Sequence, residues 1–206
     1  MLLTRAKSQA NAMQPPPASD WIRRWTHLIP ENVLVLDVAC GSGRHMKWFH
    51  DKGISVLGVD RDPVALKTAS AWGETLLADI ENNAWPFELS PGNVRQFGAI
   101  VVTNYLWRPL LSTLLRSVKD EGVLIYETFA DGNQRYGKPS RPDFLLNPGE
   151  LLKICAQTEG IQVVAYENGI LGEPDRCVQR VVAIRQSLVA QTQHSRTPLF
   201  PRNPHN

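Results

Sequence analysis

The chain has 206 residues, 43% of them hydrophobic, and its formal net charge is +2 at pH 7. This length and composition fit one domain with a sizeable core. The slight charge, without a Lys/Arg cluster interleaved with aromatic residues, argues against nucleic-acid binding, and no run reaches the roughly 20 apolar residues of a membrane span.

The N-terminal residues 1–17 end in Pro15-Pro16-Pro17 and predict a flexible segment outside the core. Met13 offers an alternative start, which would make residues 1–12 an upstream extension. The first helix is expected over 18–28, at the beginning of a single domain that covers residues 18–185.

The segment 33–44, VLVLDVACGSGR, is the most informative part of the chain. An apolar strand ends at Asp37, and a small-residue turn leads into a helix expected over 44–52. At Gly41 and Gly43 the missing Cβ atoms let backbone N–H groups approach a ligand closely. Cys40, in the same turn, is expected to be a packed thiol. The pattern is typical of a cofactor site, although Asp37 as a structural acceptor for loop amides is an alternative.

A second apolar run, Ile54 to Val59, ends at Asp60, about twenty residues after the turn. A carboxylate there can accept hydrogen bonds from both hydroxyls of a ribose, which implies an adenosine-bearing ligand. Alternatively, the stretch from Asp60 is only a helix start, with Asp62 as N-cap and Pro63 at the first position of a helix over 62–72.

Nicotinamide and S-adenosylmethionine enzymes share this arrangement, and the turn separates them. A dinucleotide fingerprint requires a third glycine, but Met46 stands in its place. Asp37 would lie close to a pyrophosphate, whereas it suits the ammonium and sulfonium charges of S-adenosylmethionine. The charges favour the cationic ligand.

Two further strands are predicted to end at polar side chains. The strand over Glu74–Ala78 precedes Asp79, which is alternatively a solvated turn residue, and the strand over Phe97–Thr103 precedes Asn104. Leucines at helical spacing predict a helix over 108–118, and the fifth strand is expected over Val123–Glu127.

The C-terminal third continues the alternation. Asn147-Pro148-Gly149-Glu150 is a capping box that places Pro148 at the first position of a helix over 148–158. Two strands over 161–167 and 178–185 follow, joined by a segment without helical periodicity, and are expected to pair as an antiparallel hairpin. Residues 186–206 predict a flexible tail. Strands alternating with helices predict an α/β fold, a parallel sheet with helices on both faces.

Three segments of the chain resemble the class I S-adenosylmethionine-dependent methyltransferases: VLDVACGSGR at 35–44, GVDRDPVAL at 58–66 and LLADIEN at 76–82. The resemblance implies a Rossmann-like doubly wound sheet of seven strands in the order 3-2-1-4-5-7-6, mostly parallel with the last strand antiparallel. It also implies S-adenosylmethionine as cofactor, with S-adenosylhomocysteine as product. The cofactor-binding residues that it implies are Asp37, Ala39, Gly41, Gly43, Asp60, Arg61, Asp79, Ile80 and Asn104.

These residues have separate implied roles. Gly41 and Gly43 cradle the methionine moiety, with Asp37 oriented towards it. Asp60 holds the ribose. Asp79 accepts from the adenine amino group, and Asn104 lies between the cofactor and substrate sites.

Within the class, NYLWR at 104–108, YETFA at 126–130 and RPDFLLNPGEL at 141–151 resemble the small bacterial methyltransferases of the tellurite-resistance type. That likeness implies methylation of a small molecule or a soft chalcogen nucleophile. The residues contain no direct signature for tellurite.

The loop over 128–146 is longer than the roughly 12 to 15 residues usual inside a domain, so we interpret it as a lid. Phe129, Tyr136 and Arg141 of this loop are expected to contact the substrate. Arg108, in the loop after the fourth strand, is the fourth expected contact. Surface salt bridges are the alternative use of the arginines.

Methyl transfer needs mainly positioning and desolvation. If the acceptor carries a proton, a base is useful. Glu127 is the first candidate and Tyr105 the second, while His45 is more plausible as a support of the cofactor loop. Glu127 has an alternative role, in which it anchors lid amides or pairs with Arg108.

The leading hypothesis is a bacterial, cytoplasmic methyltransferase acting on a small-molecule acceptor. The three cysteines fit a reducing compartment, because Cys40, Cys155 and Cys177 show neither metal-ligand spacing nor an even disulfide framework. The competing hypotheses are an RNA or protein methyltransferase, a non-catalytic protein that binds S-adenosylmethionine or S-adenosylhomocysteine, and, third, a nicotinamide oxidoreductase. No membrane or metal partner is expected.

Overall fold

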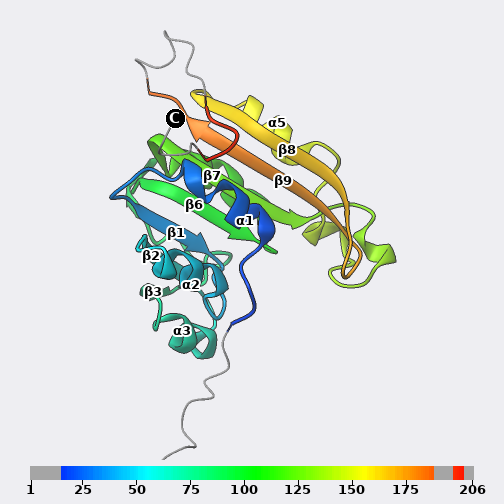
Figure 1. Cartoon of the computed structure of the whole chain (residues 1–206), viewed down its shortest axis with the longest axis horizontal. Coiled ribbons are helices and arrows are strands. Elements are labelled where there is room, and N and C mark those ends of the chain that lie inside the picture. The colour runs from blue at the N-terminus through cyan, green and yellow to red at the C-terminus, as the bar shows by residue number, and fades with distance from the viewer. Residues whose placement is uncertain (1–14, 188–196, 202–206) are drawn as a thin grey trace, which may run out of the picture.

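A computed structural model describes residues 15–187 and 197–201 of the chain. Within these ranges, seven strands form one sheet in the order β3-β2-β1-β6-β7-β9-β8 (Figure 1). The strands are β1 (Leu34–Val38), β2 (Ser55–Asp60), β3 (Glu74–Leu77), β6 (Phe97–Thr103), β7 (Val118–Phe129), β8 (Ile161–Leu171) and β9 (Arg176–Arg185).

The pairing of these strands confirms the predicted fold class and strand order. Strands β3, β2, β1, β6 and β7 pair in parallel. Strand β9 pairs antiparallel with both β7 and β8, so β8 runs in the direction of the other five. The antiparallel strand is therefore the last in the chain, as expected.

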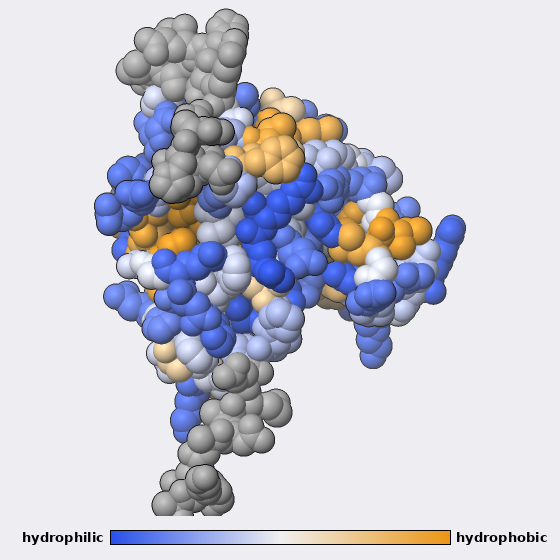
Figure 2. All heavy atoms as spheres, viewed as in Figure 1, coloured by the Kyte–Doolittle hydropathy of each residue, from blue (hydrophilic) through white to orange (hydrophobic). Residues whose placement is uncertain are grey.

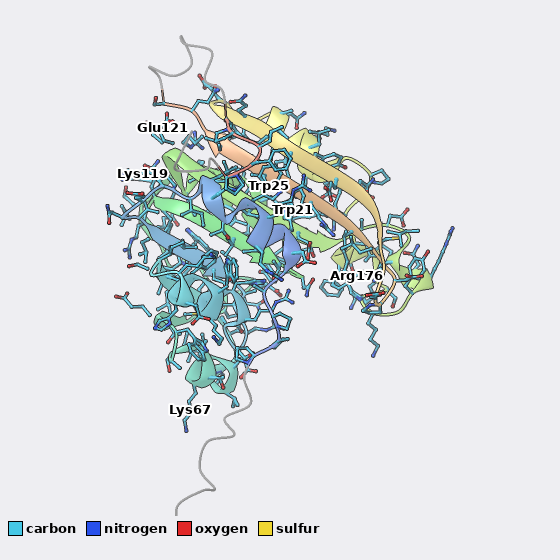
Figure 3. All side chains as sticks on the ribbon, in the orientation of Figure 1. Trp21, Trp25, Lys67, Lys119, Glu121 and Arg176 are labelled. Carbon is cyan, nitrogen blue, oxygen red and sulfur yellow. The ribbon has the colours of Figure 1, made fainter. Side chains whose placement is uncertain are left out.

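Helices cover both faces of the sheet and bury its apolar side chains. On one face lie α1 (Asp20–Trp25), α2 (Arg44–Asp51) and α3 (Pro63–Ala69), and on the other lie α4 (Leu111–Arg116) and α5 (Glu150–Ala156). Trp21 and Trp25 of α1 are completely buried and meet edge to face, with their ring centroids 5.6 Å apart (Figure 3). Because β1, β2 and β6 are covered on both sides, their sequences are nearly continuous apolar runs, and β7 becomes one from Val123 onward.

Short 3-10 turns extend several of these elements: Thr26–Leu28 after α1, Arg108–Leu110 before α4, and Asn133–Arg135 and Pro142–Phe144 in the expected lid. The helices expected over 18–28 and 108–118 are each a 3-10 turn joined to a short α-helix. The latter ends at Arg116, because Val118 already pairs with Phe97 at the start of β7.

The capping box starts a shorter helix than expected. Gly149 has a positive φ of 75°, so Pro148 lies outside the helix and α5 begins at Glu150. The reciprocal contact of the box is nonetheless present, since the Asn147 N–H donates to Glu150 Oε2 at 2.8 Å.

A second, two-stranded sheet was not predicted. It consists of β4 (Glu88–Ser90) and β5 (Asn93–Val94). Val94 of this sheet joins Trp85, Phe87 and Phe97 in the core, whereas Leu89 is exposed. Strands this short carry too few residues for a clear alternation.

The expected lid is closed at its base by the sheet. An isolated bridge pairs Ala130 with Leu146, and the Ala130 N–H donates to the carbonyl of Cys177 in β9. Inside the loop, the buried Asn133 side chain donates to the Pro139 carbonyl and accepts from the Cys177 N–H. These contacts hold the loop against the β8–β9 hairpin.

Most of the expected terminal segments, and Met13 with them, lie outside the described residues. Of the tail, residues 197–201 lie near the first helical segment, where the Pro198 carbonyl is 3.2 Å from His27 Nε2. The visible face carries separate apolar patches in a mainly hydrophilic surface (Figure 2). Among the described helices, none is long and apolar enough to cross a membrane.

Candidate active site

The carboxyl ends of β1, β2, β3, β6 and β7 meet at one edge of the sheet. Backbone hydrogen bonds tie neighbouring ends together: Cys40 N–H to the Val59 carbonyl, Ala78 N–H to that of Asp60, and Asn104 N–H to that of Glu127. Side chains that follow these strands are therefore brought to the same edge, where open α/β sheets bind ligands.

The glycine turn after β1 has two glycines with different functions. A Cβ added to Gly41 would meet nothing within 4 Å, so the space beside its backbone is free. A Cβ at Gly43 would come within 2.9 Å of Ala69, so this glycine allows α2 and α3 to pack closely. Ala39 has a positive φ of 53° and turns the backbone towards the cavity described below.

Asp60 joins this glycine turn to the start of α3, with one carboxylate oxygen on each side. Its Oδ2 accepts from the Gly41 N–H at 2.8 Å, and its Oδ1 accepts from the Asp62 N–H at 2.9 Å. Asp62 is the N-cap of α3 and accepts from Val64 N–H and Ala65 N–H. The helix-start interpretation thus applies to Asp62, and Asp60 is left at the ligand side.

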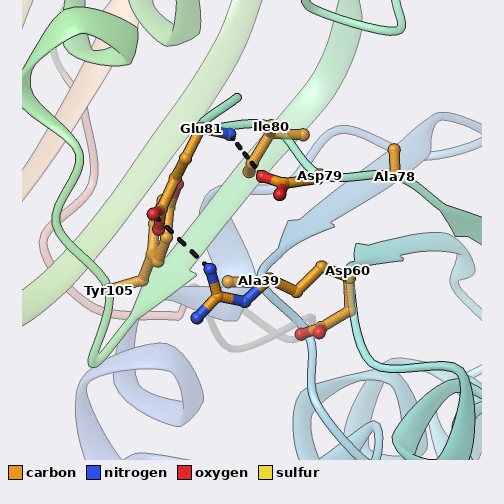
Figure 4. Close-up of a pocket in the computed structure, with 8 residues that line it drawn as sticks. Ala39, Asp60, Ala78, Asp79, Ile80, Glu81 and Tyr105 are labelled. Atoms are coloured by element: carbon orange, nitrogen blue, oxygen red, sulfur yellow. Dashed lines mark hydrogen bonds and ion pairs between the residues drawn. The ribbon is translucent and has the colours of Figure 1, made fainter. Parts of the chain in front are cut away.

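A cavity of about 130 Å³ lies between the turns that follow β1, β2, β3 and β6 (Figure 4). Five of the nine expected cofactor residues line it, and so does the candidate base Tyr105. Its lining consists of Ala39, Asp60, Arg61, Ala78, Asp79, Ile80, Glu81 and Tyr105.

Asp79 organises the turn on the β3 side of the cavity. Its Oδ1 accepts from the Glu81 and Asn82 N–H groups, and its Oδ2 accepts from the Asn82 amide at 2.9 Å. Hydrogen bonds from the Asn82 side chain and the Glu81 N–H hold the pKa of Asp79 below its ordinary value. Asp79 therefore stabilises the turn and also lines the cavity.

Asp37 lies deeper, at the end of β1, and is 1% exposed. Burial raises its pKa to about 8, against the opposing effect of the nearby Arg44 guanidinium. Its Oδ2 has no hydrogen-bond partner among the described residues and lies 3.9 Å from His45 Nδ1. A buried carboxylate oxygen without a partner is suited to pairing with a cationic group of a bound ligand.

His45 is a structural support. Burial and then Arg44 lower its pKa to about 3, so the ring is neutral. Its Nε2 accepts from the Ser19 N–H at 3.3 Å, which assigns the proton to Nδ1 on the side of Thr103 and Asp37. The expected role of His45 as a support of the cofactor loop stays a prediction.

Glu127, the first candidate base, is buried and engaged through both oxygens. Its Oε1 accepts from Ser19 Oγ at 3.2 Å, and its Oε2 lies 3.1 Å from Arg180 Nε. Arg180 also pairs with Glu167 and lies over the Trp21 ring. Glu127 therefore pairs with Arg180 and not with Arg108, because the antiparallel register places Arg180 directly beside it.

Tyr105, the second candidate base, lines the cavity with Asp60 and Asp79. Burial, and next the Glu81 carboxylate, raise the pKa of Tyr105 well above its ordinary value. A phenol that holds its proton so firmly is a weak base at neutral pH. Its position makes Tyr105 part of the cavity wall.

The expected substrate residues do not converge on this cavity. Arg108 forms an ion pair with Glu150 at 2.7 Å and donates to the carbonyls of Asp143 and Leu145. This pairing raises the pKa of Arg108 and ties the end of the lid to α5. Its guanidinium is thus occupied within the protein.

The other expected substrate residues lie in or beside the lid. Arg141 is exposed, pairs with Asp143 at 2.8 Å and lies over the Phe144 ring. Tyr136 is 41% exposed, and Phe129 is half-buried at the end of β7. These residues remain predictions as substrate contacts. Asn104 is exposed, with a positive φ of 55°, at the end of β6.

Residues 35–122 match the family model of the methyltransferase domain. The segment from β1 into β7 is therefore similar to a methyltransferase domain. The match agrees with the methyltransferase resemblance of the motifs, which implies S-adenosylmethionine as cofactor. No curated protein sequence matches the chain significantly.

Solved structures share the fold of this chain at low identity. One, described with the conversion of a disulfide bond into a thioacetal group during echinomycin biosynthesis, has a TM-score of 0.60, 14% identity and 86% coverage of both chains. A TehB-like methyltransferase of Corynebacterium glutamicum has a TM-score of 0.55 and 18% identity, with 81% of this chain and 87% of that chain covered.

A third structure is the glycopeptide N-methyltransferase MtfA complexed with S-adenosylmethionine. Its TM-score is 0.55 and its identity 16%, with coverage of 81% of this chain and 92% of that chain. At these identities the likeness establishes the fold alone. The acceptors of these proteins do not carry over to this chain.

Three residues that contribute to this site were not predicted from the sequence: Ser19, Glu81 and Arg180. Ser19 is 108 residues from Glu127, and Arg180 lies in a strand interpreted only as part of a hairpin. Glu81 directly follows Asp79-Ile80, so its place two residues after a strand-end carboxylate was the one available signal.

Proposed function

We propose that the protein transfers the methyl group of S-adenosylmethionine to a small-molecule acceptor bound beyond the ends of β6 and β7. The observation that carries the proposal is the cavity that joins Asp60, Asp79 and Ile80 next to the open backbone of Gly41. A carboxylate for the ribose, an acidic turn and an apolar side chain for the base are the groups an adenosine needs.

The described residues fit the cofactor at three points. Asp60 would hold the ribose, Ile80 would pack beside the adenine, and the orphaned Asp37 Oδ2 would face the cationic methionine moiety. S-adenosylmethionine supplies an electrophilic methyl group on a sulfonium, whose departure leaves a neutral thioether. The protein has to bind, orient and exclude water.

We further propose that Glu127 acts at the acceptor side. Ser19 and Arg180 keep this buried carboxylate in place at the end of β7. For an acceptor that carries a proton, Glu127 would take that proton through an oxygen that exchanges its bond to Ser19. For an acceptor without one, Glu127 would serve only to anchor Ser19 and the start of α1.

A direct test is calorimetric titration of ligand-stripped protein with S-adenosylmethionine, S-adenosylhomocysteine and NAD in parallel. We expect binding of the first two in the micromolar range and none of NAD. Binding of NAD alone would overturn the proposal.

Turnover requires a second assay, in which release of S-adenosylhomocysteine is followed with panels of thiol, selenol, amine and phenol acceptors. Salt-insensitive turnover of one class supports a small-molecule acceptor, whereas salt-sensitive methylation of RNA would overturn it. Tight binding without turnover on any panel would indicate a binding protein.

The role of Glu127 has its own test. Glu127→Gln should lower kcat while leaving the affinity for S-adenosylhomocysteine within about twofold, since the amide keeps a partner for Ser19. Equal losses of turnover and cofactor affinity would make Glu127 purely structural.

A cytoplasmic location is part of the same proposal. The three cysteines are all unpaired thiols, as is usual for proteins of reducing compartments. Fractionation of the native host should find the protein with cytoplasmic markers.

A further inference from the structure

An ion pair spans the cofactor cavity. Arg61 follows β2 and Glu81 follows β3, and both residues line the cavity. Arg61 Nη1 lies 3.6 Å from Glu81 Oε2. The Arg61 side chain is 64% exposed and that of Glu81 25%, so the pair sits where the cavity meets solvent.

The Tyr105 hydroxyl lies near the Glu81 carboxylate but forms no hydrogen bond of good geometry with it. Its oxygen is buried and forms no hydrogen bond within the described residues. Burial raises the pKa of Tyr105 most, the Glu81 carboxylate raises it further and the Arg61 guanidinium lowers it, as expected for charges that line the same cavity. An unsatisfied buried hydroxyl costs about 1–3 kcal/mol, and one that faces a cavity can recover this from a ligand.

The Glu81 backbone is fixed to the adenine side of the cavity. Its N–H donates to Asp79 Oδ1 at 3.0 Å, and Asn82 binds both oxygens of the same carboxylate. Glu81 therefore cannot move independently of Asp79. The Glu81 carboxylate extends from this fixed backbone and pairs with the longer, more exposed side chain of Arg61.

We propose that Arg61, Glu81 and Tyr105 form a clasp that closes over the adenosine of the bound cofactor. The inference rests on the proposed function, because it requires a nucleoside in this cavity. Glu81 is a positioning residue that holds the planar guanidinium of Arg61 across the opening, where it can lie over the base. Tyr105 gives its unused hydrogen bond to the nucleoside.

The clasp makes two kinetic predictions. Release of S-adenosylhomocysteine requires the Arg61–Glu81 pair to open, so breaking the pair speeds dissociation. Salt screens an exposed pair, so dissociation from the unmodified protein accelerates with ionic strength. The hydrogen bond of Tyr105 is less exposed and contributes to the lifetime without this salt dependence.

The test is the dissociation rate of S-adenosylhomocysteine from the full chain, measured by displacement at low and high salt. Glu81→Gln should raise the rate by about two- to fivefold, the range of one exposed ion pair, and should flatten its salt dependence. Tyr105→Phe should raise it by about two- to tenfold, the effect of one hydrogen bond, and keep the salt dependence.

Asp51→Asn is the matched control, because it removes an exposed carboxylate paired with Lys47 outside the cavity. It should leave the rate unchanged, and thermal unfolding should show that all variants are folded. Unchanged dissociation from both Glu81→Gln and Tyr105→Phe would overturn the clasp alone. If the unmodified protein bound neither S-adenosylhomocysteine nor S-adenosylmethionine, the proposed function and the clasp would both fall.

Discussion

The three carboxylates at neighbouring strand ends differ in what surrounds them. Asp37 is buried beside a neutral His45, Asp60 accepts from two loop amides, and Asp79 organises its own turn. The same residue type therefore carries a raised pKa at position 37 and a lowered one at position 79. Burial without a partner accounts for the first, and hydrogen bonds to the charged form account for the second.

Asp37 should make the stability of the protein depend on pH. Burial raises its pKa to about 8 in the folded state, whereas an unfolded Asp titrates near about 3.9. Between these values the folded chain keeps a proton that the unfolded chain has lost. The free energy of unfolding should therefore fall as pH rises from about 4 to about 8.

Asp37→Asn should weaken this decline and raise the free energy of unfolding at pH 8 by about 1–3 kcal/mol, because an amide has no charge to bury. Urea unfolding at pH 5, 6.5 and 8 measures it. Asp120→Asn, an exposed site on β7, is the control that keeps the original slope. Identical slopes for Asp37→Asn and the unmodified protein would contradict the prediction.

Substitutions of Asp60 and Asp62 should have different effects, the first on ligand affinity and the second on stability. Asp60→Ala should weaken the affinity for S-adenosylhomocysteine by about 1.5–3 kcal/mol, the scale of hydrogen bonds to a charged group. Asp62→Ala should leave the affinity unchanged but cost about 1 kcal/mol of stability, because it removes the N-cap of α3. Calorimetry and denaturant unfolding give the two readouts, and the reverse assignment would show that Asp60 is only a helix start.

At the scale of elements, the site depends on segments that hold one another. Helix α1 starts at Ser19, which reaches Glu127, while Arg180 of β9 links Glu127 to Trp21. The lid is held in the same manner at its other end, where Arg108 bridges Glu150 and two lid carbonyls. Long side chains with several partners thus replace regular secondary structure in these connections.

The lid should loosen when its arginine anchor is removed. Arg108→Met keeps the aliphatic stem but loses three partners, so amide hydrogen exchange should accelerate over residues 141–147. Stability should fall by about 1–3 kcal/mol, because the Glu150 carboxylate loses its ion pair. Arg141→Met, which breaks only an exposed pair, is the control. Unchanged exchange in Arg108→Met would show that the base of the lid suffices to order it.

At the scale of the whole molecule, the cavity exists only when the sheet is assembled. Its lining comes from the turns after β1, β2, β3 and β6, which meet because those strands pair in parallel with matched ends. A ligand that spans these turns binds the folded state alone. Folding and cofactor binding are therefore linked.

S-adenosylhomocysteine should accordingly raise the stability of the whole chain. At a concentration of about 100 times Kd, the gain is about 2.7 kcal/mol, and a thermal melt with and without ligand measures it. Asp60→Ala at the same ligand concentration should show a smaller shift. An equal shift with NAD would contradict the specificity of the site.

The sequence by itself determined the α/β class, the chain order of the elements and the carboxylates at the strand ends. These features are local, because a buried strand, a glycine turn and an amphipathic helix each leave a pattern within about 10 residues. Two helix boundaries differ from the predicted ones. The helix before β7 ends earlier because Val118 pairs with Phe97, and α5 begins later because the positive φ of Gly149 excludes Pro148.

Only the tertiary structure decided the partners of the polar side chains. Ser19 is joined to Glu127 across 108 residues, Arg108 to Glu150 across 42, and Arg61 to Glu81 across the cavity. Tyr105 moved from candidate base to cavity wall for the same reason. A charged or hydroxyl side chain has many possible partners along the chain, and the packing of strands from distant segments selects one of them.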